Sequence, residues 1–316
     1  MLGDILNEQF QKMLESRKTL GFSVDENTMG LLKPFIRYCG ELFPDENTIK
    51  EYMLIQWLEQ HNYDNPNSLN VFLSQLNALT SFILFTGGDI SFSPIDYTTK
   101  WVRHIPGLPN DEEIMSLFQA IDTLPDRPAT YPPVNLIFPV LTRFMFLCGM
   151  RPQEPGKLVR DEVDLSTGDI YIRKSKKNKD RHIIISEDMR NLCSIFDSLQ
   201  DRNRYYFFEF NGKPLSSSWI WNNLRKTIRD NGLENLYSFR PYDFRHLFAS
   251  RTIMKWIDNK QDVMKLLPYL SVYMGHSDIK YTMYYVHLLP ERLKKTSGID
   301  WTIFNQIYGG IDNEDS

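Results

Sequence analysis

Apolar residues recur at helical spacing along the first hundred positions of the chain. Three stretches carry them three and four residues apart: 27–43, 46–61 and 65–85. This spacing predicts amphipathic helices. We expect the third helix to start near Asn67 or Ser68 and to end before Gly87. The pattern predicts a small helical bundle over residues 1–104.

A break in the helical pattern follows the bundle. The stretch RHIPGLPN contains two prolines and a glycine, which interrupt a helix. Asn110 can then cap a new helix, and the acidic residues from Asp111 onward suit its positive end. We therefore predict a linker over 105–110 and a second domain over 111–316.

The second domain mixes two periodicities. VNLIFPVLTRFMFLCG predicts an apolar helix kinked at Pro139. IYIR and HIIIS alternate on either side of a basic stretch, which predicts a β-hairpin with lysines at its tip. From residue 215 onward the pattern is helical again. The expected fold class is mainly α with a small β-hairpin or sheet (α+β).

Charge is unevenly distributed along the chain. The net charge of −4 does not by itself favour nucleic-acid binding. Residues 1–110 contribute −5, from 8 basic and 13 acidic side chains, and the remainder contributes +1. Residues 171–182, YIRKSKKNKDRH, hold six Lys or Arg and one acid. Such a run is either a solvated loop or a nucleic-acid contact.

Composition bounds the class of protein. The chain of 316 residues is 42% hydrophobic and 24% charged, which is typical of a globular protein. No run of about 18 apolar residues is present, so we expect no membrane association. The acidic start does not resemble a signal peptide, which predicts a cytoplasmic location. Cys39, Cys148 and Cys193 are far apart and are expected to be reduced thiols.

Three motifs in the second domain contain residues suited to phosphate chemistry. CGMRPQEPGKL contains Arg151 and Glu154, and YDFRHLFASR contains Arg245. MGHSDIKYTMYYVH contains His276 and then Tyr281, Tyr284 and Tyr285. Each motif alone has an ordinary explanation: an ion pair, a surface arginine, a helix cap or a set of core aromatics.

The order of these motifs resembles the tyrosine recombinase (phage integrase) family. That pattern is an Arg in a G-x-R-x-x-E box, a Lys on a β-hairpin, a His-x-x-Arg box, a Gly-His box and a tyrosine nine residues after that second His. The resemblance covers the whole chain, with 1–104 similar to the core-binding domain and 111–316 to the catalytic domain. It implies these catalytic residues: Arg151, Lys176 (with Lys174 and Lys179 as the nearest alternatives), Tyr242, Arg245, His276 and Tyr285.

The chemistry implied by the resemblance suits these residue types. Attack on a phosphodiester places negative charge on the non-bridging oxygens, which guanidiniums bind in bidentate fashion. A tyrosine hydroxyl, with an ordinary pKa of ~10, needs a base or a cationic field to act as a nucleophile. His276 can donate or accept a hydrogen bond there, and a lysine can protonate the leaving 5′ oxygen. No metal or other cofactor is expected.

The sequence departs from the family pattern at three positions. Tyr242 stands where the His-x-x-Arg box has its histidine, and it is a poor base at neutral pH. Pro152 and Pro155 flank a region that the family keeps helical. His246 directly follows Arg245 and is expected to be structural, because it would point to a different face of the helix.

The sequence is compatible with two functions. The first is site-specific cleavage and rejoining of DNA through a phosphotyrosine, and the second is a recombinase-fold DNA-binding regulator, such as a phage repressor, that no longer recombines DNA. Both predict double-stranded DNA as the partner, with self-association on it as a dimer or tetramer. The predicted DNA contacts come from the hairpin: Arg173, Lys174, Lys177, Lys179 and Arg181.

Overall fold

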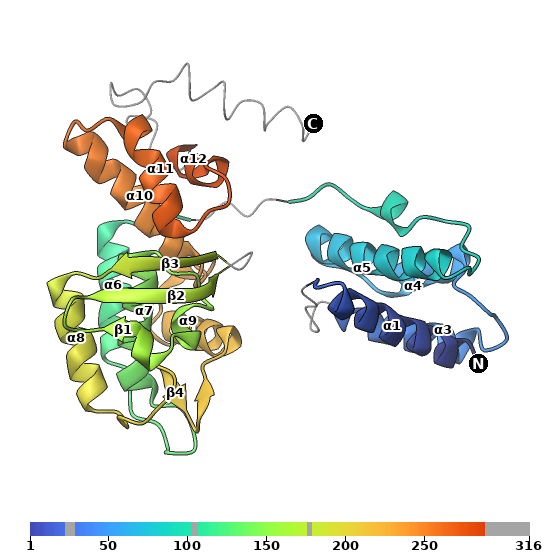
Figure 1. The fold of residues 1–316 in the computed structure, drawn as a ribbon, viewed down its shortest axis with the longest axis horizontal. Coiled ribbons are helices and arrows are strands. Elements are labelled where there is room, and N and C mark those ends of the chain that lie inside the picture. The colour runs from blue at the N-terminus through green and yellow to red at the C-terminus, as the bar shows by residue number, and fades with distance from the viewer. Residues whose placement is uncertain (23–28, 103–106, 176–178, 288–316) are drawn as a thin grey trace. The chain divides into compact units, whose positions relative to one another are not determined.

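A computed structural model describes residues 1–22, 29–102, 107–175 and 179–287 (Figure 1). The side chains of residues 174, 175, 179 and 287 lie outside this description. The chain divides into two compact units, Met1–Ile105 and Pro106–Ser316. The division falls within the predicted linker, and the roles assigned to the two domains remain predictions.

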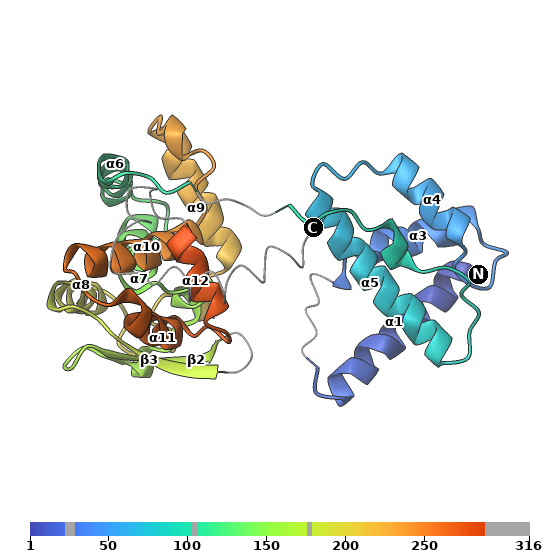
Figure 2. The ribbon, with the colours of Figure 1, turned by 90° about the horizontal axis from the view of Figure 1, so that it is seen from above.

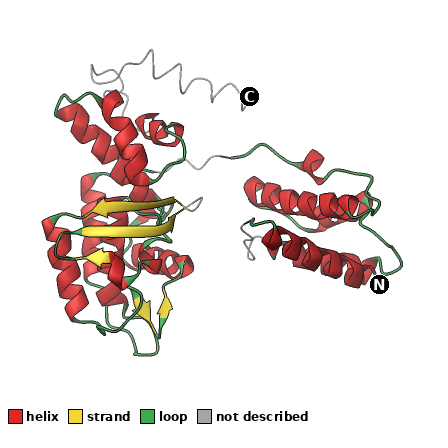
Figure 3. Cartoon of the chain, in the orientation of Figure 1, coloured by secondary structure: helices red, strands yellow, loops and turns green. Residues whose placement is uncertain are grey.

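The N-terminal unit is built from helices and loops over its described residues (Figure 3). Its elements are α1 (Leu2–Thr19), α3 (Leu32–Leu42), α4 (Glu51–Gln60), α5 (Pro66–Phe85) and the 3-10 turn η1 (Pro94–Tyr97). Apolar faces of all four helices meet in one core. Helices α1 and α3 approach closely at two glycines, where a Cβ added to Gly40 would lie 2.7 Å from Gly3 Cα.

Helix α5 begins at Pro66, one residue before the predicted start near Asn67. Asn65 caps it by accepting a hydrogen bond from Asn67 N at 2.9 Å, and Pro66 occupies the first turn. By length and composition alone, α5 could cross a membrane. It buries Leu73, Leu76 and other apolar residues in the core of the unit, and core helices meet the same criterion.

The C-terminal unit combines helices with two small sheets, which confirms the α+β prediction (Figure 3). Its first elements are α6 (Asp111–Asp122), α7 (Val134–Cys148), η2 (Pro155–Lys157), η3 (Arg160–Glu162), β1 (Val163–Asp164), β2 (Asp169–Ser175), β3 (Lys179–Ile184) and α8 (Glu187–Ser198). The others are β4 (Glu209–Phe210), β5 (Lys213–Pro214), α9 (Ser217–Asp230), η4 (Glu234–Leu236), α10 (Asp243–Asp258), α11 (Val263–Met274) and α12 (Lys280–His287).

Two local sequence signals in this unit are confirmed. Asn110 caps α6 in a reciprocal arrangement with Glu113, in which each side chain accepts the other residue's backbone N–H at 2.9 Å. Strands β2 and β3 pair as an antiparallel hairpin, and β1 adds to the free edge of β2. The tip of the hairpin, residues 176–178, lies outside the described residues.

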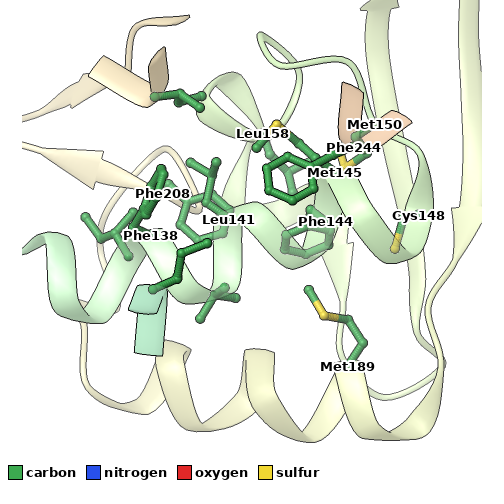
Figure 4. Close-up of a cluster of buried hydrophobic side chains, with 14 of the residues drawn as sticks. Phe138, Leu141, Phe144, Met145, Cys148, Met150, Leu158, Met189, Phe208 and Phe244 are labelled. Carbon is green, nitrogen blue, oxygen red and sulfur yellow. The ribbon is translucent and has the colours of Figure 1, made fainter. Parts of the chain in front are cut away.

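Helix α7 forms the centre of the unit's main core. Phe138, Leu141, Phe144 and Met145 lie on it and are fully buried, and residues from other elements pack around them (Figure 4). The helix continues through Pro139 and ends at Gly149, which adopts a left-handed conformation with φ of 60°. A Cβ at Gly149 would lie 2.4 Å from the Phe248 ring, so both conformation and space require glycine here.

Helices α10, α11 and α12 pack together (Figure 2), and they lie at one end of the unit (Figure 1). They enclose a separate, smaller core that includes Ile253, Leu267, Met283 and Tyr285. Helix α10 also packs along α7, and α11 lies against β3. This arrangement brings the ends of α7, β3, α11 and α12 to one place, and the three sequence motifs lie there.

Candidate active site

Arg245 is fully buried where the ends of α7, β3, α11 and α12 meet. It extends from the first turn of α10 and donates hydrogen bonds to the backbone oxygens of Gly149 and Met274, each at 2.5 Å. It also contacts His276 Nε2 at 2.9 Å. Burial lowers the pKa of Arg245, yet a guanidinium stays charged in a protein. A single cation therefore joins α10, the end of α7 and the turn after α11.

Arg151 reaches the same turn from another direction. Its Nη2 donates to the backbone oxygen of Gly275 at 2.7 Å, and its side chain is buried. Arg245 donates to the preceding carbonyl, that of Met274. Because the two oxygens belong to consecutive residues, the two guanidiniums lie close together. The charge of Arg151 accordingly helps to lower the pKa of Arg245, after the larger effect of burial.

Glu154 holds a second pair of guanidiniums. It accepts both Nη atoms of Arg181 at 2.8 and 2.7 Å, and Arg151 Nη1 at 2.9 Å. Its Oε2 also accepts the backbone N–H of Arg151 at 2.7 Å. Burial acts to raise the pKa of Glu154, but these hydrogen bonds and charges hold it below its ordinary value. One carboxylate thus faces two arginines, and with Arg245 the cluster retains a positive charge.

Arg181 differs from the sequence expectation. It was assigned to DNA contact on the hairpin, but its side chain is only 6% exposed and is engaged by Glu154. Along β3 and the residue after it, Arg181, Ile183 and Ile185 are buried while His182 and Ile184 are exposed. The two-residue period of a strand therefore turns Arg181 inward.

His276 is a neutral imidazole with both nitrogens occupied. A guanidinium can only donate, so Nε2 accepts from Arg245 and Nδ1 must carry the proton. Nδ1 then donates to Thr282 Oγ1 at 2.7 Å. Burial and the charges of Arg245 and Arg151 lower the pKa of His276 to about 3. Its protonated form is therefore disfavoured throughout the physiological range.

We expect His276 not to titrate between pH 5 and 8. Its lowered folded-state pKa means that the neutral form persists well below the ordinary imidazole pKa of ~6.5. Nitrogen-15 NMR of histidine-labelled protein should show a constant Nδ1–H tautomer for His276 over that range. An Nε2–H tautomer or a titrating His276 signal would contradict this arrangement.

The three tyrosines of α12 have different surroundings. Tyr281 is 61% exposed, Tyr284 is partly buried, and Tyr285 is 2% exposed. The Tyr285 ring lies against His276, with centroids 6.1 Å apart and planes at 23°. Burial raises the pKa of Tyr285 well above its ordinary value, although the charge of Arg245 opposes this. In this arrangement the Tyr285 hydroxyl keeps its proton until a base removes it.

The hairpin residues are described only in part. Arg173 is exposed, forms an ion pair with Glu162 and lies over the Tyr171 ring. Lys176 and Lys177 lie outside the described residues, so the predicted catalytic lysine is not located. Lys174 and Lys179 belong to β2 and β3 by their backbone, but their side chains also lie outside the description. Among the described residues, no His, Cys, Asp and Glu side chains cluster as metal ligands would.

A family model for the phage integrase family matches residues 110–292. The chain belongs to this family. Tyrosine recombinase XerD of Lacticaseibacillus casei is 28% identical over 257 residues, covering 77% of this chain and 80% of that protein. The matched segment of 110–292 contains Arg151, Arg245, His276 and Tyr285.

Solved structures of integrases and recombinases share the fold. XerH site-specific recombinase, in a post-cleavage complex on a palindromic difH substrate, aligns with a TM-score of 0.62 at 19% identity, covering 92% of this chain and 83% of that one. A lambda integrase (75–356) dimer bound to a COC′ core site aligns with a TM-score of 0.61 at 15% identity, covering 89% and 93%. At these identities the likeness establishes the fold.

The box that ends at Arg245 differs from the family pattern, because Tyr242 stands in place of its histidine. Tyr242 stands at the junction with α10, is 40% exposed, and its ring centroid lies 5.1 Å from that of His246. His246 in turn lies 5.4 Å from Tyr285 and 6.2 Å from Tyr284, centroid to centroid. His246, which we expected to be structural, therefore packs against two tyrosines of α12.

Sequence reasoning did not place Arg181, His246 and Thr282 in this candidate site, although the first two had a usable signal. The alternation of β3 turns Arg181 inward, as described above. Tyr242 and His246 are four residues apart at the start of a helix, which places them on one face. Thr282 had no such signal, because its role depends on how the turn after α11 folds back onto α12.

Proposed function

We propose that this chain cleaves and rejoins duplex DNA at a specific site through a covalent 3′-phosphotyrosine on Tyr285. The observation that carries the proposal is the meeting of Arg151 and Arg245 on the consecutive carbonyls of Met274 and Gly275, beside the buried Tyr285. Membership of the phage integrase family supports it. The order of events would be attack on phosphorus, departure of the 5′ oxygen, and the reverse with a new 5′ hydroxyl.

The guanidiniums would bind the reacting phosphate. Arg245 Nε is buried and has no hydrogen-bond partner among the described residues. A buried donor without a partner costs ~1–3 kcal/mol. A non-bridging phosphate oxygen would satisfy that donor, and its charge would be stabilised more strongly as it grows in the transition state. The fixed hydrogen bonds of Arg245 to Gly149 and Met274 would hold the donor in place before DNA binds.

The other partial reaction is protonation of the leaving 5′ oxygen. Lys176 on the hairpin is our candidate for this acid, with Lys174 and Lys179 as alternatives. An ammonium near the phosphate can give up a proton as the bond to oxygen breaks. After cleavage the same lysine, now neutral, would accept the proton of the incoming 5′ hydroxyl.

Duplex DNA is the proposed partner, with more than one copy of the chain on each site. XerH in the matched structure is bound to a palindromic substrate, and lambda integrase is a dimer on its core site. The hairpin side chains proposed to contact the backbone are those of Arg173, Lys174, Lys177 and Lys179. Arg181 is assigned instead to the phosphate-binding cluster, because it pairs with Glu154.

A suicide substrate tests the proposal directly. The bound sequence is recovered by affinity selection from random duplexes, and nicks are tiled across it so that a short 5′ fragment can diffuse away after cleavage. We expect a protein–DNA adduct that survives denaturation at one nick position. Digestion and mass spectrometry should place the DNA on Tyr285. Tight, selective binding with no adduct at any nick position would overturn cleavage and leave a DNA-binding regulator.

A further inference from the structure

Removal of the Tyr285 proton is a step for which His276 is not equipped. Its Nε2 lone pair accepts a hydrogen bond from Arg245, and its Nδ1 donates to Thr282. A neutral imidazole has one lone pair, so His276 has none left for a tyrosine hydroxyl. The neighbouring charge of Arg245 further opposes its protonation. Another group must take the proton if Tyr285 attacks a phosphate.

His246 is the imidazole that lies against Tyr285 from the other direction. It is carried by α10, one turn after Tyr242, and Tyr285 belongs to α12, which packs on α10. The ring planes of His246 and Tyr285 are inclined at 58°, and their centroids are 5.4 Å apart. His246 is only partly buried, so it can exchange a proton with solvent. Rings at this separation are in direct contact.

We propose that His246 accepts the Tyr285 proton during strand cleavage, in place of the box histidine that Tyr242 has replaced. The inference rests on the proposed function. The phenolic oxygen forms its bond to phosphorus, its proton passes to the neutral imidazole, and the 5′ oxygen departs with a proton from the hairpin lysine. On rejoining, the imidazolium returns its proton to Tyr285 as the phosphotyrosine bond breaks. The proton count is the same before and after the cycle.

Several titratable or charged groups surround His246 and would tune this transfer. Tyr242 and Arg245 lie on its own helix, and Tyr242 contacts its ring. Tyr284 and Tyr285 face it from α12, and His276 is close enough for the two imidazoles to influence each other. The phenol of Tyr242 is a poorer base than imidazole at neutral pH, so it cannot perform this step alone.

The test isolates proton removal from leaving-group departure. A substrate with sulfur in place of the bridging 5′ oxygen needs no acid, because a thiolate leaves readily. With the full-length protein we expect the cleavage rate to rise with pH between about 5 and 8, where imidazoles titrate. His246→Gln should remove this rise and lower the plateau rate by ~10²-fold or more. A flat wild-type profile would overturn the inference without any variant.

Controls separate this role from a structural one. His61→Gln removes an imidazole that stacks on Trp57 in the N-terminal unit, and it should keep the pH-dependent rise. Binding of the intact site by His246→Gln should match wild type, which shows that the variant is folded. A His246→Gln protein that retains the rise would overturn the inference while the proposed function stands. A wild-type protein that forms no adduct would overturn both.

Discussion

Tyr285→Phe should abolish the covalent protein–DNA adduct while leaving DNA binding nearly intact. The substitution removes one oxygen, and without it no bond to phosphorus can form. The phenyl ring keeps its packing in the core of α10, α11 and α12. We therefore expect adduct yield below detection, affinity for the intact site within about twofold, and a change in unfolding free energy of about 1 kcal/mol or less. Denaturing gels, titration of labelled DNA and urea unfolding measure the three quantities.

Tyr284→Phe is the matched control for this substitution. Tyr284 is the adjacent residue on α12 and also contacts His246, so the same chemical change is made one position away. It should retain at least half of the wild-type adduct yield. If Tyr284→Phe lost the adduct and Tyr285→Phe retained it, the nucleophile would be Tyr284. Equal adduct yields in both variants would show that neither of these α12 tyrosines is the nucleophile.

Glu154→Gln should be the most destabilising conservative change in the C-terminal unit. Glu154 is the carboxylate that pairs with both Arg151 and Arg181, and all three side chains are at most 6% exposed. Glutamine preserves size but leaves two buried guanidiniums without a counter-charge. Breaking a buried pair in this way costs ~3–5 kcal/mol. Urea unfolding at pH 7 measures the loss.

An exposed ion pair supplies the matched comparison. Asp230 pairs with Lys226 on the surface of α9, and its side chain is 42% exposed. Asp230→Asn makes the same chemical change and should cost far less stability than Glu154→Gln, because solvent screens the pair. If the two variants lost similar amounts of stability, Glu154 would not be acting as a buried counter-charge.

The stabilisation of the folded protein by Glu154 should decrease as the pH falls. Its pKa in the folded protein is lowered, so the unfolded chain binds a proton more readily. The stabilisation is therefore complete above the unfolded-state value of about 4.3 and declines as pH falls below it. The stability difference between wild type and Glu154→Gln should be largest near neutral pH and should shrink in acid. A difference that grows on acidification would contradict this assignment.

Local signals predicted those elements of the fold whose stabilising contacts are made between residues close in the sequence. The cap of α6 needs only Asn110 and Glu113, which are three residues apart. The β2–β3 hairpin needs only alternation on both sides of a polar turn. The start of α5 lies within one residue of its predicted position, because Asn65 supplies the cap and Pro66 suits the first turn.

The site was harder to predict because its contacts are made across the fold. The motif order indicated Arg151, Arg245, His276 and Tyr285, but no spacing rule places Arg245 on the carbonyl of Gly149, 96 residues away. The tautomer of His276 depends on Thr282 and Arg245 together. Such three-dimensional networks determine which group can accept a proton, and the sequence pattern alone cannot.

The manner in which Arg245 is held has an electrostatic consequence. Its hydrogen-bond acceptors are backbone oxygens at the ends of α7 and α11, together with a neutral imidazole. Helix C-termini carry partial negative charge and solvate a cation without neutralising it. A carboxylate in their place would cancel the positive charge and leave little attraction for a second anion. Dipolar solvation leaves the charge of Arg245 uncancelled, so under the proposed function its field would act on the incoming phosphate. Salt should screen this buried field far less than that of the exposed hairpin cations.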